Sequence, residues 1–181
     1  MRFRDPSLWQ FMLNNFVLSE ANVTQGRIWT ILTSAFSHSQ GQHIILNCLG
    51  LYFIAPAAAG VLGSAGFLGL YLAGDSILPP WDVAPVLSIC PDQADRWSGS
   101  EGASGAIYAT LGFWGSMSPQ STIYVYFLLP LPVWVFIGGI FAFDLYGIIF
   151  TPNSGTDSAA HVGGLLTGLV MAYRLKRFPR W

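Results

Sequence analysis

The sequence predicts an all-α membrane protein, a polytopic bundle of about five transmembrane helices with an amphipathic amino-terminal loop. Of its 181 residues, 52% are hydrophobic and only 9% are charged, whereas an average soluble domain has about 25% charged residues. The hydrophobic residues also gather in runs of nearly membrane-spanning length. We expect a single domain over 1–181, with an interfacial segment at 1–36, transmembrane helices within 43–173 and a basic tail at 174–181.

The charge balance restricts the partners that we expect. The formal net charge of -1 provides no broad basic field, so we expect membrane lipid as a partner and no nucleic acid. Cys48 lies in an apolar run and Cys90 in a polar stretch, a pattern that does not indicate a disulfide framework. We expect neither a cofactor nor a metal site.

The first elements are short. Residues 8–36 alternate apolar with polar positions, which is typical of short helices lying in the membrane interface rather than of a span. The first candidate span covers 43–59, with Pro56 near its far end, and the second covers 61–73.

A polar stretch at 74–101 then predicts a long loop outside the hydrocarbon. The third span covers 103–117, and the fourth lies within 123–150. Because proline interrupts helices, Pro130 and Pro132 indicate that the fourth helix begins after them and that the preceding residues are irregular.

The fifth span covers 158–173, after a break at 151–155, and it ends in basic residues. By the positive-inside rule this end faces the cytoplasm or its topological equivalent. Counting back from it places the amino-terminal segment and the 74–101 loop on the opposite face.

Three polar residues share one depth in this topology. His43, Ser104 and His161 each lie in the first turns of helices that begin at that opposite face. Polar groups in hydrocarbon are costly unless they are satisfied, so we expect a shared polar cavity. A serine hydroxyl becomes nucleophilic when a neighbouring base removes its proton, and histidine suits that role. The pair indicates nucleophilic acyl transfer, with Ser104 attacking and His161 as base.

Other groups fit the same chemistry. Ser104 lies at a helix start, where backbone N–H groups are free to stabilise an oxyanion. His43 and Asn47, one helical turn apart, present side-chain donors on one face. Tyr108 lies one turn after Ser104, where its ring is expected to pack on His161.

Glycines support close helix packing around these residues. Gly102 and Gly105 lie on either side of the serine in Gly-Ala-Ser-Gly, a motif that by itself is more typical of packed membrane helices than of a catalytic site. Gly164 and Gly168 form a small-xxx-small pair that brings the fifth span close to another helix, for which the Ser104 helix is the candidate.

Three further polar residues are less clear from the sequence. His38 is expected to be structural. Asp157 is expected to cap the last helix, with completion of a catalytic triad as the alternative. Asp144 lies within the fourth span, where a charge indicates function, but the sequence names no partner for it.

Taken together, these motifs resemble the rhomboid intramembrane serine proteases. The resemblance runs in the family's order over 26–173. It rests on Trp29-Thr30-Ile31-Leu32-Thr33-Ser34-Ala35-Phe36-Ser37-His38, on His43 and Asn47, on Gly102-Ala103-Ser104-Gly105, and on Ala160-His161 with Gly164 and Gly168.

The resemblance implies a Ser104/His161 dyad without a catalytic acid. It also implies an oxyanion hole formed by His43, Asn47 and the Ser104 N–H, with Tyr108 against His161. The implied substrates are single-span membrane proteins cut at or near the membrane. The sequences at 33–38 and 158–161 are most similar to those of the mitochondrial branch, and this resemblance implies that the protein lies in the mitochondrial inner membrane.

The sequence also departs from the family. The family's core has six spans, the first before the amphipathic loop, and this sequence shows five, so we interpret it as lacking the first. The family's Trp-Arg pair reads Trp29-Thr30 here, with Arg27 close by. Two alternatives stay open: a non-catalytic or truncated relative that binds membrane clients, and a small transporter for which Gly-Ala-Ser-Gly serves packing alone.

Overall fold

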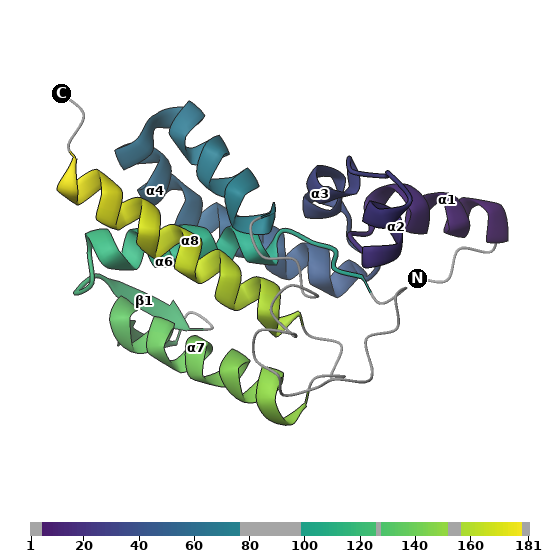
Figure 1. Cartoon of the computed structure of the whole chain (residues 1–181). Coiled ribbons are helices and arrows are strands. Elements are labelled where there is room, and N and C mark those ends of the chain that lie inside the picture. Colours follow the sequence, from purple (N-terminus) through teal and green to yellow (C-terminus); the bar gives the residue numbers. More distant parts are fainter. Residues whose placement is uncertain (1–4, 77–98, 126–127, 152–156, 179–181) are drawn as a thin grey trace.

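The architecture is mostly helical. The structure is a computed structural model that describes residues 5–76, 99–125, 128–151 and 157–178 (Figure 1). Within these ranges the chain forms helices and one two-stranded hairpin. The predominantly helical fold expected from the composition is therefore confirmed.

Four short helices form the amino-terminal segment, which lies to one side of the longer helices (Figure 1). They are α1 (Pro6–Phe16), α2 (Glu20–Thr24), α3 (Thr30–Thr33) and the 3-10 helix η1 (Ser34–Phe36). The side chains of Asp5 and Ser19 accept backbone N–H bonds at the starts of α1 and α2, which explains why these helices begin there. Large apolar side chains such as Phe11 and Trp29 remain exposed, as expected for amphipathic interfacial helices.

Helix α4 (Gly41–Ser76) contains both of the first two predicted spans. The chain bends sharply inside it at Gly63, where φ is 70° and ψ is 169°, a conformation that glycine adopts at least cost. The end of the second half of α4 lies close to η1, which precedes the first half. The Tyr71 hydroxyl donates a hydrogen bond to the Ala35 carbonyl there, at 3.1 Å. The helix continues to Ser76 and so covers the first three residues of the predicted 74–101 loop. Residues 77–98 of that loop lie outside the described residues.

Helix α6 (Ser104–Met117) is the central helix, and most of its residues are buried. One side packs on both halves of α4, where Ile107 and Leu111 join Ile54 and Tyr71 in a hydrophobic cluster. A second cluster joins α4, α6 and α8 through Ala58, Leu70, Ala109, Phe113 and Ala172. The helix that carries Ser104 is therefore held by neighbours on several sides.

A β-hairpin precedes α7 (Val133–Phe150). Its strands, β1 (Thr122–Val125) and β2 (Leu129–Pro132), pair antiparallel. The prediction of irregular chain before the fourth helix was wrong, because strand pairing satisfies backbone groups that irregular chain near lipid would leave exposed. The predicted helix start is confirmed, since α7 begins directly after Pro132.

Helix α8 (Ser158–Arg177) lies alongside α6 (Figure 1). The Asp157 carboxylate accepts the Ala160 N–H at 3.1 Å, so the expected capping role of Asp157 is confirmed. The last turn carries Arg174, Lys176 and Arg177. The Lys176 ammonium donates to the Ser116 carbonyl near the end of α6, where the helix dipole favours a cation.

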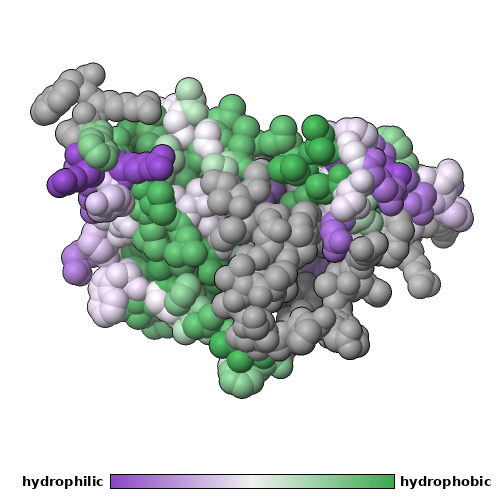
Figure 2. Space-filling view, in the orientation of Figure 1, coloured by the Kyte–Doolittle hydropathy of each residue, from purple (hydrophilic) through white to green (hydrophobic). Residues whose placement is uncertain are grey.

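The outer surface is apolar over the long helices. In Figure 2, hydrophobic residues cover much of the coloured surface over the long helices, and hydrophilic residues gather at the end of α8 and around the amino-terminal helices. Within the described ranges, Gly41–Asp75 and Val133–Phe150 are the two helices long and apolar enough to cross a membrane by length and composition.

Candidate active site

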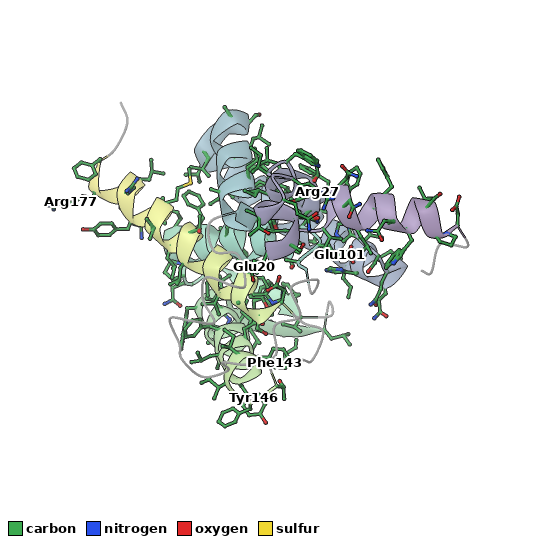
Figure 3. All side chains as sticks on the ribbon, turned by 45° about the vertical axis from the view of Figure 1, so that its right-hand side comes forward. Glu20, Arg27, Glu101, Phe143, Tyr146 and Arg177 are labelled. Carbon is green, nitrogen blue, oxygen red and sulfur yellow. The ribbon has the colours of Figure 1, made fainter. Side chains whose placement is uncertain are left out.

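The chain leading to Ser104 is fixed by the amino-terminal segment. Three contacts hold it there: Ser100 pairs with Leu18 through two backbone hydrogen bonds, the Glu101 carboxylate accepts the Ser39 N–H, and the Gly102 N–H donates to Ser34 O, all at 2.8 to 2.9 Å. Glu101 is labelled in Figure 3. Ser104 then opens α6, where backbone N–H groups lack intrahelical partners. These contacts set the position of the serine and of the N–H groups around it.

Helices α6 and α8 approach closely at two glycines of α8. A β carbon on Gly164 would lie 2.1 Å from the Gly105 carbonyl oxygen, and one on Gly168 would lie 2.0 Å from the Ala109 carbonyl oxygen. Only hydrogen fits at either position, because the neighbouring atoms belong to the α6 backbone. The pairing of Gly164 with Gly105 brings the first turn of α8, which carries His161, beside the start of α6, which carries Ser104.

The ring of His161 is held from two directions. Tyr108 of α6 stacks on it with ring centroids 4.2 Å apart and an interplanar angle of 11°, which is the contact expected from the sequence. On the α7 side, Asp144 Oδ1 lies 2.9 Å from His161 Nδ1. The imidazole is 12% exposed and the carboxylate is fully buried.

The Asp144 contact was missed by sequence reasoning, which named no partner for this residue. A charge inside an apolar helix signals that a partner exists, but the sequence does not say which helix supplies it. Asp157, the acid considered as a triad member because it lies one turn before His161, instead caps α8. Its Oδ1 accepts a backbone N–H, whereas the Asp144 carboxylate faces the imidazole.

His43 and Asn47 project from the first turns of α4 toward the chain before Ser104. Gly102 has a φ of +109°, and a β carbon there would lie 2.6 Å from His43 Cε1 and 3.2 Å from Asn47 Nδ2. Glycine therefore serves two purposes, since it permits the backbone conformation and leaves room for both side chains. The structure thus brings two side-chain donors next to the backbone N–H groups at the start of α6.

His38 joins this group, although the sequence offered no partner for it. Its Nε2 lies 2.7 Å from Asn47 Nδ2 and accepts the Ala103 N–H at 3.4 Å. Both neighbours are donors, so a neutral ring accepts through Nε2 and carries its proton on Nδ1, a buried nitrogen with no hydrogen-bond partner among the described residues. Burial lowers the pKa of His38 below its ordinary value of 6.5, and the nearby His43 lowers this pKa further, while Glu101 opposes the shift. His38 therefore holds the Asn47 amide in place as a hydrogen-bond acceptor.

Removing a side-chain donor from this group is expected to slow turnover without unfolding the protein. For the acyl transfer that the sequence predicts, we expect Asn47→Ala to reduce kcat about 100 to 1,000-fold, because loss of one oxyanion donor costs roughly that factor. His43→Ala should have a similar or smaller effect. Steady-state cleavage of a membrane substrate measures both, and unchanged rates in both variants would remove these residues from the mechanism.

The lowered pKa of His38 predicts a loss of stability in mild acid. The unfolded chain binds the proton more readily than the folded protein, so the folded state loses stability as the pH falls below about 6.5. We expect the Tm of the wild-type protein in detergent to fall more steeply from about pH 7 to about pH 5 than that of His38→Gln, which does not titrate there. Parallel curves for the two proteins would contradict this account of His38.

The site as a whole lies at one end of the helix bundle. The starts of α4, α6 and α8 meet there, and the basic end of α8 lies at the other end of that helix. The residues brought to this end are His38, His43, Asn47, Gly102, Ser104, Tyr108, Asp144 and His161. They supply a hydroxyl, an imidazole hydrogen-bonded to a carboxylate, and several donors.

Known proteins are similar to this sequence over most of its length. Residues 25–178 match the Rhomboid domain family. The chain is 34% identical to RHOMBOID-like protein 12, mitochondrial, of Arabidopsis thaliana, over 93% of this chain and 52% of that protein. It is 28% identical to Rhomboid protein 1, mitochondrial, of Saccharomyces cerevisiae, over 95% of this chain and 48% of that protein. It is 30% identical to Presenilin-associated rhomboid-like protein, mitochondrial, of Bos taurus, over 92% of this chain and 43% of that protein.

The chain spans about half the length of these relatives. The family match nevertheless covers most of the chain and includes every residue of the site described above. The protein therefore belongs to the rhomboid family, on the branch of these mitochondrial members.

Proposed function

We propose that the chain is an intramembrane serine endopeptidase, which hydrolyses peptide bonds in or near the transmembrane segment of single-span membrane proteins. Ser104 is the nucleophile and His161 the general base. The observation that carries the proposal is the approach of Gly164 to Gly105, which brings the two helix starts bearing these residues together. Membership of a family whose members are generally serine proteases supports it.

The arrangement suits a two-step hydrolysis. In the first step, His161 takes the Ser104 proton as Oγ attacks the scissile carbonyl carbon, and the imidazolium then protonates the leaving amine. The developing oxyanion accepts hydrogen bonds from the Ser104 N–H and from the His43 and Asn47 side chains. In the second step, His161 activates a water molecule that hydrolyses the acyl-enzyme and restores Ser104.

The membrane setting is part of the same proposal. The two halves of α4 with α6, α7 and α8 form five transmembrane helices, of which α6 is short at 14 residues, or about 21 Å. Because α6 is surrounded by other helices, its ends need not reach both membrane surfaces to satisfy its backbone. The mitochondrial relatives and the apolar helices support a place in a mitochondrial membrane, and the proposal assigns the chain to the inner one.

The proposal is tested by comparing two substrates in liposomes. One is a single-span reporter with small residues near the membrane surface, and the other carries the same cleavable sequence without its transmembrane segment. We expect the purified chain to cut the membrane-bound reporter and to cut the soluble peptide much more slowly. Failure to cut either substrate would contradict a protease, and equal cutting of both would contradict specificity for membrane substrates.

A further inference from the structure

Asp144 differs from the rest of helix α7. Among the described α7 residues, only Val133 and Asp144 are buried, and Asp144 has no exposed surface. Its neighbours Phe143 and Tyr146 are 66% and 56% exposed, and both extend away from the other helices (Figure 3). The one acidic residue of α7 is therefore also the one that faces inward from the middle of the helix toward α8.

Such a carboxylate needs a compensating partner. A buried charge costs several kcal/mol unless it is paired and hydrogen-bonded, and in the second half of an apolar helix this cost is high. The described partner is His161 Nδ1 at 2.9 Å. The side chains of Tyr108 and Ser158 also lie beside the carboxylate, so three residues from α6 and α8 surround it.

The contact has a specific chemical consequence for His161. A carboxylate accepts hydrogen bonds, so the imidazole nitrogen that faces it carries the proton. With the proton on Nδ1, the lone pair is on Nε2, which is the nitrogen left free to act as a base. The stacked Tyr108 fixes the plane of the ring, and Asp144 fixes its rotation within that plane. When His161 gains the serine proton, the carboxylate also stabilises the resulting cation.

We infer that Asp144 is a positioning residue that makes the site a Ser104–His161–Asp144 triad, with the acid supplied by α7. This inference rests on the proposed function of Ser104 and His161. Catalysis then depends on the packing of α7 against α8, because displacement of α7 breaks the hydrogen bond between Asp144 and His161 that orients the base. Among the described residues, the other titratable groups at this end of α6 and α8 are Tyr108, which stacks on His161, Asp157, which caps α8, and Asp75, which lies beside Gly105 and close enough to Asp157 for their charges to interact.

The kinetic test replaces Asp144 with asparagine, which keeps its size. We expect Asp144→Asn to reduce kcat about 100 to 10,000-fold, because an amide does not enforce the tautomer or stabilise the imidazolium, with KM for the reporter nearly unchanged. Asp144→Glu should recover part of the rate. In the His161→Ala background, Asp144→Asn should cause no further loss, since Asp144 acts through His161. Asp157→Asn is the matched control, and we expect it to stay within about tenfold of the wild-type rate because it weakens only a helix cap.

A second measurement is independent of proteolysis. The ¹⁵N spectrum of histidine-labelled protein in detergent, assigned with His161→Ala, reports which ring nitrogen of His161 carries the proton. We expect a protonated Nδ1 in the wild-type protein and a changed tautomer population in Asp144→Asn. A wild-type His161 protonated on Nε2 alone, or an Asp144→Asn rate equal to that of Asp157→Asn, would overturn the inference. A wild-type protein that cuts no substrate but has His161 protonated on Nδ1 would instead overturn the proposed function and leave the Asp144 contact standing.

Discussion

Cleavage of the single-span reporter is expected to fall to background when either Ser104 or His161 is replaced by alanine. Loss of a serine nucleophile or of its base costs about a million-fold in kcat, because no other group supplies the attacking oxygen or accepts its proton. The expected loss is equally severe for the two residues, since they act as a unit.

Both variants should keep their fold. Ser104 and His161 are only partly buried, and the glycine contacts that join α6 to α8 involve neither side chain. Tm in detergent, measured beside the cleavage assay, separates lost chemistry from lost structure. Cleavage that survives either change in a folded protein would remove that residue from the active site.

The second large effect is expected from a single methyl group at Gly164. Its β carbon would meet the Gly105 carbonyl oxygen at 2.1 Å, and this backbone atom is fixed by the loop contacts before Ser104. Gly164→Ala therefore forces α8 away from α6, and a misplacement of about 1 Å costs about 100-fold in rate. We also expect a loss of about 1 to 3 kcal/mol in the free energy of unfolding from overpacking.

Helix α7 offers a matched control for this change. A β carbon on Gly138 or Gly139 would meet no atom within 4 Å, so Gly138→Ala is expected to leave cleavage unchanged. Its effect on stability should be neutral or slightly favourable, because alanine is the better helix former. Cleavage rates and Tm values measured for both variants test the account, and equal behaviour of Gly164→Ala and Gly138→Ala would contradict the packing argument.

The sequence predicted the positions of the helices well where a strong local signal was present. Pro132 marked the start of α7, and the basic residues marked the end of α8. The hairpin before α7 was not predicted, because its two prolines were interpreted as marking irregular chain before the helix. The structure places Pro130 and Pro132 in the second strand of a two-stranded ribbon, where each strand keeps an unpaired edge.

The candidate site was predictable to the extent that its residues have local motifs. Ser104, His161, His43 and Asn47 lie at helix starts that the hydrophobic runs locate, and the glycine pair of α8 indicates a close partner. Their catalytic roles remain a proposal.

The contacts of His38 and Asp144 could not be predicted from the sequence. Each depends on the rotation of one helix or loop against another, which hydrophobic periodicity does not determine. The sequence did indicate that Asp144 and His161 lie at similar depths in the membrane, because Asp144 lies about two turns from the end of α7 and His161 about one turn from the start of α8. The sequence did not indicate the direction in which the Asp144 side chain faces.

The most direct test of the central claim is covalent labelling of the purified chain by a fluorophosphonate probe, which reacts with activated serine hydroxyls. The wild-type protein, Ser104→Ala and His161→Ala are reconstituted side by side in liposomes, and the labelled residue is identified by mass spectrometry. The account predicts labelling on Ser104 in the wild-type protein and none in either variant. Labelling that persists without His161, or the absence of labelling in a folded wild-type protein, would contradict the claim that α6 and α8 assemble a working serine–histidine pair.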